Sequence, residues 1–491
     1  MVNKKKIIID KDESMIVNFN IKSKKLKYKR VMLTTARMPD LGTTALHYGD
    51  LRPPMGLGYI AAFLEKHGIE VTIVDNYVEE RDMKAEIDDF QPDLIGLYMH
   101  TPGYYVALDL INELKQLTSA PLVIGGPHAS LCPETIPDKV DYICQGEGES
   151  VMLELCRGAN FPKLIDNAIS GRIKKLDDMP FPNYDHFWGK NYNWTFDIYR
   201  NDSSRVFTMH TSRSCPYRCT FCGVESIWTR RYTYFSAKKI VQEIDHYVDK
   251  YGVDGIYFRE DLFTANHNRL REVCDLLIER PYSINWACEA RADITDKALL
   301  DKMYKSGCRG MYLGVESGDD EGLKKKKKDL DLNTMRQFFG HANEIGLATY
   351  ATFCMGTPGE TEEEIAATER FIEEIKPTTY DKFAYLGLPK SQDYHTLLET
   401  KDYYHIDAGK IVYSEKFYEM AHRLYDKNDQ RLYFLKQQKK FLNENRGFLS
   451  EEELANYRFP RMDESEISSV ASSSNDYRFG EEKRIADAKI V

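Results

Sequence analysis

Three cysteines stand close together near the middle of the chain, in the segment Cys215-Pro-Tyr-Arg-Cys219-Thr-Phe-Cys222. Three thiolates on one short loop can bind three irons of a four-iron cluster, which usually takes four cysteines. The next cysteine is Cys274, so the loop brings no fourth thiol with it. We therefore expect one iron that the polypeptide leaves unligated, and an open coordination position is where a metal performs chemistry.

A structural zinc site is the alternative for the same cysteines, with His210 as a fourth ligand. Structural zinc sites usually combine two C-x2-C pairs, and this sequence offers no second pair. The C-x3-C-x2-C spacing, Phe221 before the last cysteine and Gly223 after it favour the iron–sulfur cluster.

An N-terminal series of strands and helices begins near residue 30. Apolar strand candidates occur at 31–35, 70–74, 93–98, 121–125 and 142–144, with amphipathic helices between them. Strands that are apolar throughout indicate a parallel sheet covered on both faces. The fold class predicted for residues 30–160 is α/β, a doubly wound, Rossmann-like domain. Its ligand should lie at the carboxyl ends of the strands.

A second series begins near residue 201 and contains the cysteines. Strand candidates lie at 206–210, 255–258, 284–288, 310–315, 348–353 and 383–386, and helical patterns separate them. Six such units predict a partial, TIM-like (β/α)6 barrel over residues 201–390. In such barrels the site is built from the loops after the strands. The cysteines follow the first strand, which suits that arrangement.

The remaining segments have weaker patterns. We expect an N-terminal arm at 1–29, a linker at 161–200, a small, mostly helical region at 391–465 with a long helix near 414–445, and a flexible tail at 466–491. The net charge of −10 does not favour nucleic acid as a partner. Since the sequence shows no signal peptide, no membrane span and no disulfide scaffold, we expect a cytoplasmic location.

The segment around the cysteines, Ser212-Arg-Ser-Cys-Pro-Tyr-Arg-Cys-Thr-Phe-Cys-Gly223, resembles the radical S-adenosylmethionine (SAM) superfamily. Similar segments follow later strands, at 286–293, 314–318 and 356–361. In that superfamily SAM chelates the open iron through its amino and carboxylate groups. The resemblance implies SAM contacts from Phe221, Gly223, Glu260, Arg291, Glu316, Ser317 and Gly356.

The chain departs from this pattern after the second barrel strand. A glycine-glycine-glutamate-like stretch often holds the SAM amino group there, and here the residues are Arg259-Glu260-Asp261. Either Glu260 or Asp261 could take that role.

Three N-terminal segments resemble the B12-binding domain that precedes such barrels in one subclass: Arg52-Pro-Pro-Met-Gly-Leu-Gly-Tyr59, Gly125-Gly-Pro-His-Ala-Ser130 and Gln145-Gly-Glu-Gly-Glu149. The resemblance implies cobalamin contacts from Pro54, Gly56, Gly125, Gly126, His128, Gly146 and Glu147. The D-x-H-x-x-G motif that supplies a cobalt ligand in many B12 proteins is absent. His47, His100 and His128 are the imidazoles available, each better explained as a loop histidine.

The resemblance implies an enzyme that contains a [4Fe-4S] cluster, SAM and cobalamin. Such an enzyme cleaves SAM to a 5′-deoxyadenosyl radical, abstracts hydrogen from an unactivated carbon of a small-molecule or lipid substrate, and then transfers a methyl group. It would need an electron donor such as flavodoxin or ferredoxin. Two alternatives stay open: a radical enzyme that does not methylate and has an empty or repurposed B12-like domain, and a cluster- or zinc-bearing sensor without catalytic activity.

A run of five lysines, Lys324 to Lys328, stands apart from these motifs. It could attract a phosphorylated or acidic substrate. A solvated surface turn is the interpretation that we favour for such a run.

Overall fold

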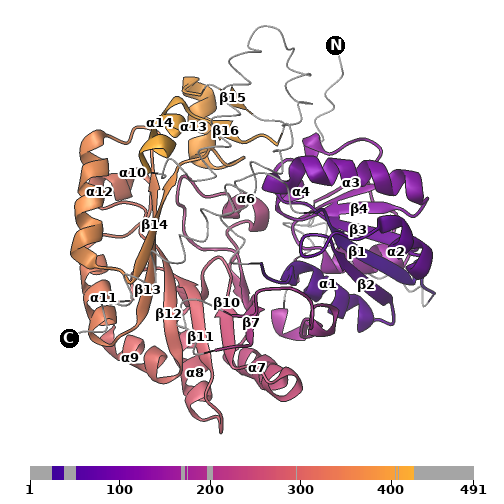
Figure 1. Ribbon diagram of the computed structural model, residues 1–491, viewed down its shortest axis with the longest axis horizontal. Coiled ribbons are helices and arrows are strands. Elements are labelled where there is room, and N and C mark those ends of the chain that lie inside the picture. The colour runs from indigo at the N-terminus through magenta and orange to yellow at the C-terminus, as the bar shows by residue number, and fades with distance from the viewer. Residues whose placement is uncertain are drawn as a thin grey trace, which may run out of the picture.

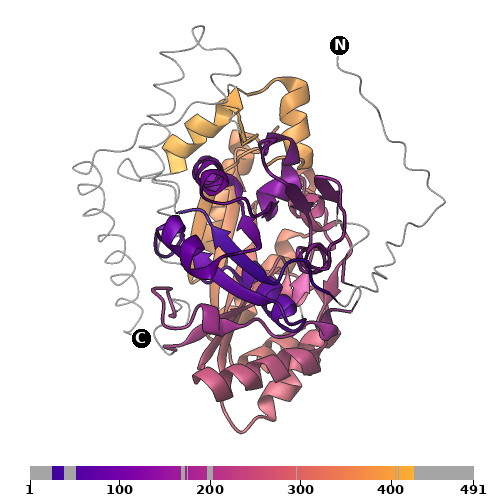
Figure 2. The same cartoon turned by 90° about the vertical axis from the view of Figure 1, so that its right-hand side faces the viewer.

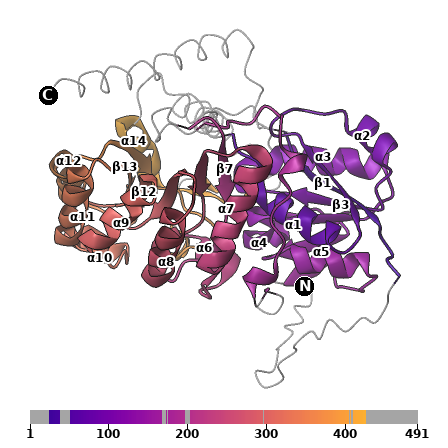
Figure 3. The same cartoon turned by 90° about the horizontal axis from the view of Figure 1, so that it is seen from below.

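The computed structural model describes residues 25–37, 51–166, 172–173, 175–195, 203–294, 296–403, 405–406 and 409–424. Two six-stranded parallel sheets lie side by side, one from each half of the chain (Figure 1). A view from below separates the N-terminal sheet and its helices from the second set (Figure 3). The predicted α/β architecture, a Rossmann-like domain followed by a partial barrel, is confirmed.

The N-terminal sheet has the order β2-β1-β3-β4-β5-β6. Its strands are β1 (Arg30–Thr35), β2 (Glu70–Asp75), β3 (Leu94–Tyr98), β4 (Leu122–Gly125), β5 (Tyr142–Gln145) and β6 (Leu164–Asp166). Its helices are α1 (Met55–Glu65), α2 (Met83–Phe90), α3 (Tyr104–Leu117), α4 (Pro127–Leu131) and α5 (Glu149–Cys156). The strand order reverses between β1 and β3, and in such sheets ligands bind outside the carboxyl ends at this reversal.

The second sheet has the order β14-β13-β12-β11-β10-β7, all in parallel register. Its strands are β7 (Val206–Met209), β10 (Gly255–Phe258), β11 (Asn285–Ala290), β12 (Cys308–Gly314), β13 (Ala348–Met355) and β14 (Thr379–Ala384). The helices between them are α7 (Ala237–Tyr251), α8 (His267–Ile278), α9 (Lys297–Lys305), α10 (Asp320–Lys325), α11 (Leu332–Glu344) and α12 (Glu362–Ile375).

The last barrel strand lies earlier than predicted, at 379–384 instead of 383–386. Its sequence Thr-Tyr-Asp-Lys-Phe-Ala is mostly polar and only Ala384 is buried, so it carries little of the apolar signal that marks an inner strand. β6 was missed for a similar reason, because only Ile165 of its three residues is buried.

The cysteines lie in an insertion between β7 and α7, which we call the cysteine excursion (residues 211–234). Two short strands close it, because β8 (Ser212–Arg213) pairs antiparallel with β9 (Thr233–Tyr234). Between them the chain carries the cysteine loop and the short helix α6 (Val224–Trp228). In Figure 1, α6 lies between the two sheets.

Residues 176–194, within the predicted linker, pack against the edge strand β7. Tyr184 is fully buried and stacks on Phe207 with ring centroids 3.8 Å apart. Its hydroxyl donates to Thr208 O (2.6 Å) and accepts from Thr208 N (2.9 Å). The amide of Val206 donates to Trp194 O (2.7 Å), so this segment satisfies backbone groups that β7 turns outward.

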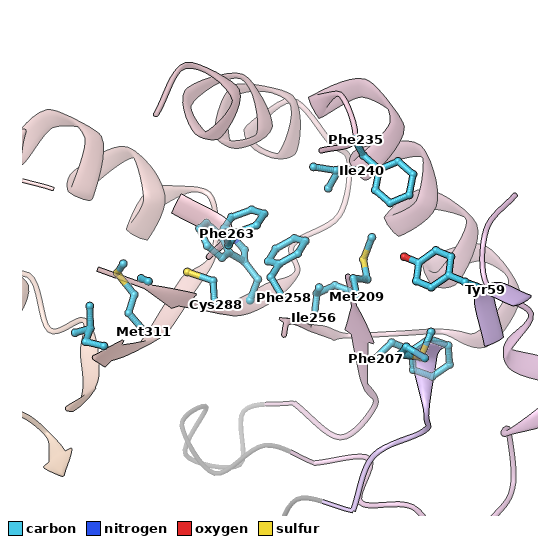
Figure 4. Close-up of a cluster of buried hydrophobic side chains, with 14 of the residues drawn as sticks. Tyr59, Phe207, Met209, Phe235, Ile240, Ile256, Phe258, Phe263, Cys288 and Met311 are labelled. Carbon is cyan, nitrogen blue, oxygen red and sulfur yellow. The ribbon is translucent and has the colours of Figure 1, made fainter. Parts of the chain in front are cut away.

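The core continues from one sheet to the other. Tyr59 of α1 lies near Phe207 and Met209 of β7 (Figure 4). Its ring stacks on Phe235 at 6.3 Å, and its hydroxyl donates to His210 O (2.9 Å). Figure 2 shows the N-terminal sheet in front of the barrel, with the two sets in close contact.

The chain after β14 forms α13 (Gln392–Thr400), the antiparallel strands β15 (His405–Ile406) and β16 (Val412–Tyr413), and α14 (Glu415–Leu424). The predicted helix at 414–445 overlaps α14. The rest of that prediction, the predicted tail and most of the predicted arm lie outside the described residues. No helix in the described segments is long and apolar enough to cross a bilayer.

Candidate active site

A cavity of about 1190 Å³ lies between the two domains. The N-terminal sheet contributes the carboxyl ends of its strands, including Thr35, Tyr98 and Gly125. The barrel contributes His210 after β7 and Phe221 of the cysteine excursion. Drug-sized ligands occupy pockets of roughly 300–1,000 Å³, so this cavity suits a larger ligand or two ligands together.

The cysteine loop is held on both sides of Thr220. Its amide donates to Lys326 O (3.0 Å), and its carbonyl accepts from Asp393 N (3.0 Å). Its hydroxyl donates to Asp393 Oδ2 (2.8 Å). The loop start is fixed by Ser214, whose amide donates to Asp261 Oδ2 (3.1 Å). The loop that carries the thiols is therefore anchored to the residue that follows α10, to the start of α13 and to the segment after β10.

The three thiols are half-buried, whereas Cys132, Cys144, Cys156, Cys274, Cys288 and Cys308 are buried. Burial raises the pKa of the Cys215 and Cys219 thiols, and it raises the pKa of Cys222 to about 12. Without metal the thiols are thus protonated at neutral pH, and metal binding must release those protons.

The thiols do not converge as they would around a single ion. Among the described residues, no three His, Cys, Asp or Glu side chains meet closely enough to hold one metal ion. His210 therefore does not join the cysteines in a zinc site. Three ligands of a four-iron cluster bind different irons and need not converge, so the donor set fits the cluster.

The carboxylate of Glu260, a predicted SAM contact, is already bound by other groups of the protein. Its carboxylate accepts from the amides of Thr211 and Ser212 (2.7 Å for Ser212) and lies 3.5 Å from Arg269 Nη2. This carboxylate braces the entry to the cysteine excursion. Asp261 lines the cavity and its side chain is exposed there. The surrounding protein still removes much of the water around its carboxyl group, and this desolvation, together with the nearby charge of Glu260, raises its pKa to about 6. Of the two acids, Asp261 is the one placed to face a ligand.

Arg291 reaches the cysteine loop from the end of β11. Its guanidinium lies 3.5 Å from the centre of the Tyr217 ring and donates to Lys328 O (2.7 Å). It also donates to Asp293 Oδ2 (3.0 Å). Arg291 is 4% exposed and does not line the main cavity, so in this conformation it supports the loop.

The predicted SAM contacts after β12 and β13 do not line the cavity. Glu316 has φ +70°, an unusual backbone for a residue with a side chain, and Ser317 is fully buried. Gly356 has φ +79°, and an added Cβ there would lie 3.3 Å from Met420 of α14. Neither these residues nor Gly223 lines the cavity, so of the predicted SAM contacts only Phe221 and Glu260 do.

The prediction of a solvated surface turn at Lys324–Lys328 is wrong for two of the five lysines. Lys326 is 1% exposed, and its Nζ lies 2.5 Å from Glu360 Oε1. Lys328 Nζ lies 3.1 Å from Glu316 Oε1, with both side chains nearly buried. The run ends α10 and passes under the cysteine loop, and buried lysines must be paired.

The glycine segments of the N-terminal domain line the cavity as predicted from their positions. Pro54, Gly56, Gly125, Gly126, Gly146 and Glu147 all do so. An added Cβ at Gly125 or Gly56 would meet nothing within 4 Å. Gly126 has φ +100°, and a Cβ there would lie 2.7 Å from Met99 O, so this glycine is required by the backbone.

His128, a predicted cobalamin contact, lies away from the cavity. Its ring is fully buried, does not line the cavity, and contacts two hydroxyls, Thr101 Oγ1 (3.2 Å) and Thr135 Oγ1 (2.8 Å). Burial lowers its pKa to about 4. His100 lines the cavity and accepts from Gly103 N (2.8 Å), and His47 lies outside the described residues.

Sequence reasoning missed Thr208 and Arg213, which also line the cavity. Thr208 is 2% exposed, and its Oγ1 has no hydrogen-bond partner in the described structure, so a ligand there would supply one. The alternation of β7 places Thr208 on the same face as His210, and that period could have identified it.

Comparison with known families agrees with this geometry. Residues 43–156 match the B12 binding domain, and residues 209–372 match the radical SAM superfamily. Together the matches cover more than half of the chain. The chain belongs to the B12-binding subclass of the radical SAM superfamily. It is a radical SAM enzyme whose cofactors are a [4Fe-4S] cluster, SAM and cobalamin.

Relatives of this chain are named for different activities. An uncharacterized methyltransferase of Pyrococcus horikoshii is 26% identical over 67% of this chain and 74% of its own length. An anaerobic magnesium-protoporphyrin IX monomethyl ester cyclase of Cereibacter sphaeroides is 26% identical over 72% of this chain. The alignment spans 62% of the cyclase.

A solved structure shares the fold across both domains. The cobalamin-dependent SAM radical enzyme OxsB, with aqua-cobalamin and SAM bound, superposes with a TM-score of 0.66 at 18% identity. The match covers 93% of this chain and 72% of OxsB. The arrangement of a B12-type domain against a radical SAM barrel is therefore shared.

Proposed function

We propose that this protein is a cobalamin-dependent C-methyltransferase that acts on an unactivated carbon of a small molecule or lipid. When bound, the reduced cluster supplies the electron that cleaves SAM to a 5′-deoxyadenosyl radical, and cobalamin supplies the methyl group. The observation that carries the proposal is the single cavity that the corrinoid-type strand ends and the cysteine excursion both line. A substrate in this cavity would lie beside the strand ends and beside Phe221, which stands between Cys219 and Cys222 in the sequence.

The residues of this chain would bind and orient the groups. We propose that Cys215, Cys219 and Cys222 ligate three irons and that Phe221 packs against the SAM bound at the fourth. We further propose that Asp261 holds the SAM amino group in place of Glu260. Gly56, Gly125 and Gly146 would admit the corrinoid to the strand ends, because a glycine leaves room for a bulky ligand.

Four further SAM contacts stay proposals that rest on the family resemblance: Arg291, Glu316, Ser317 and Gly356. They do not line the cavity, and neither do the three cysteines. Arg291 and Glu316 lie close enough to Cys219 to shift the pKa of its thiol, which supports a place for them beside the cluster. The domain boundaries at 30–160, 161–200 and 201–390 likewise stay predictions, as does the flavodoxin- or ferredoxin-like electron donor.

A non-methylating radical enzyme is the second candidate, favoured by the similarity to a cyclase. An anaerobic assay of the reconstituted protein separates the two. A methyltransferase releases both 5′-deoxyadenosine and S-adenosylhomocysteine, whereas a radical enzyme that does not methylate releases only the first. Release of neither product, with a full cluster and bound corrinoid, would contradict both.

A further inference from the structure

The loop after β5 borders the cavity, and both of its acidic side chains, Glu147 and Glu149, form ion pairs with arginines. The Glu147 side chain is 0% exposed. Its Oε1 accepts from Arg172 Nε (3.2 Å), and its Oε2 lies 3.0 Å from Arg213 Nη1. Arg213 also donates to Glu149 Oε1 (2.6 Å). The carboxylate of Glu147, a predicted corrinoid contact, therefore belongs to an ionic network between the domains.

The two arginines hold opposite ends of the cysteine excursion. Arg213 belongs to β8, where the excursion begins. Arg172 donates to Trp228 O (2.9 Å) and to Thr233 Oγ1 (2.8 Å), where the excursion ends. The three cysteines lie between these two points. One buried carboxylate of the N-terminal domain thus fixes both ends of the segment that carries the cluster ligands.

The same loop is tied to the corrinoid side of the cavity. Gly146 N donates to Ser130 Oγ (3.0 Å), and Gln145 Nε2 donates to Ser130 O (2.9 Å). Gly146 and Ser130 line the cavity. Lys390, after the last barrel strand, also donates to Ser130 O (3.1 Å). A movement of the loops after β4 and β5 would therefore also move Glu147, the residue next to Gly146.

We propose that Glu147, with Arg213 and Arg172, couples the corrinoid site to the cluster site, so that occupancy of one changes the affinity of the other. A buried ion pair tolerates little separation, because moving one partner leaves an uncompensated charge away from water. The loop after β5 and the cysteine excursion must then move together. Glu147 and Arg213 are positioning residues in this proposal, which rests on the cofactor sites proposed above.

The test is anaerobic titration of hydroxocobalamin into the full chain, with and without the reconstituted cluster, followed by absorption. Coupling between two sites typically changes an affinity by about 5- to 150-fold. We expect a ratio of dissociation constants in this range for the native protein and a ratio near one for Glu147→Gln. Glu225→Gln is the matched control, since its ion pair with Arg230 lies within the excursion, and it should keep the native ratio.

Equal dissociation constants with and without the cluster in the native protein would overturn the proposal. A folded Glu147→Gln protein that keeps the native ratio would do the same. Hydrogen exchange of the native, cluster-free protein needs no variant: added cobalamin should slow exchange of peptides within 211–234, and no change there contradicts the coupling. A protein that shows coupling but forms no SAM-derived product refutes the proposed function instead.

Discussion

Lys328 Nζ lies 3.1 Å from Glu316 Oε1, and the two side chains are 7% and 11% exposed. The pair joins the end of the lysine run to the segment after β12, beneath the cysteine loop. Cys219 lies close enough that Lys328 lowers and Glu316 raises the pKa of its thiol, although burial outweighs both. A sequence run that suggests a surface turn therefore contributes a buried charge to the site.

Replacing Lys328 with methionine should cost about 3–5 kcal/mol of unfolding free energy, because Glu316 becomes an unpaired buried charge. Lys327→Met should change stability by less than about 0.5 kcal/mol, since Lys327 is exposed and its amino group donates to the neutral Gln392. Urea unfolding of the cluster-free proteins measures both. Equal stabilities for the two variants would contradict the buried pair.

Cys219→Ala should prevent assembly of a stable four-iron cluster. The loop offers no spare thiol, and the remaining cysteines are buried or lie elsewhere in the fold. Iron content and visible absorption after anaerobic reconstitution provide the measurement. Cys274→Ala serves as the control, because this buried cysteine lies in α8, and it should keep native iron content. Full iron in the Cys219 variant would refute the ligand assignment.

Gly125→Val should raise the corrinoid dissociation constant at least about ten-fold, equivalent to about 1.4 kcal/mol. The new side chain would enter the cavity, where an added Cβ meets no atom within 4 Å, so folding should be unaffected. Absorption titration gives the affinity and thermal unfolding the stability. Gly126→Val is unsuitable for this purpose, because φ +100° and the contact with Met99 O would strain the backbone. Native affinity in folded Gly125→Val would show that the corrinoid lies elsewhere.

Glu243 should make stability fall as pH rises. Burial raises its pKa from 4.5 to about 7 in α7, where Tyr247 donates to its Oε1 (2.8 Å). Between pH 4.5 and 7 the folded state holds a proton that the unfolded state has released, so the unfolding free energy decreases across this window by up to about 3 kcal/mol. Below pH 4.5 the contribution is fully present.

The comparison of native protein with Glu243→Gln isolates this group. We expect the difference in unfolding free energy to change between pH 4.5 and 7 and to become constant above pH 7, where the amide is the more stable form. Denaturant unfolding at several pH values provides the measurement. A difference that is independent of pH would mean that the carboxyl group titrates normally.

Most strands were predictable, because apolar runs such as Leu122–Gly125 are buried on both faces and carry a strong signal. Strands with polar residues, such as Thr379–Ala384, were displaced or missed. The type and spacing of the three cysteines were enough to propose them as cluster ligands. The contacts that each side chain makes could not be predicted. The Glu147 carboxylate pairs with Arg172 and Arg213, and the Glu260 carboxylate accepts from the amides of Thr211 and Ser212, all of them distant in sequence.

The hydroxyl of Tyr184 and the carbonyl of Trp194 form hydrogen bonds with backbone groups on the outer side of β7. A partial barrel leaves an open edge, and an open edge is a template for pairing with another chain. The interdomain segment therefore does more than connect: it covers backbone groups of β7 with which another chain could otherwise pair. Its removal should give aggregates rich in intermolecular β-structure even where both sheets remain folded.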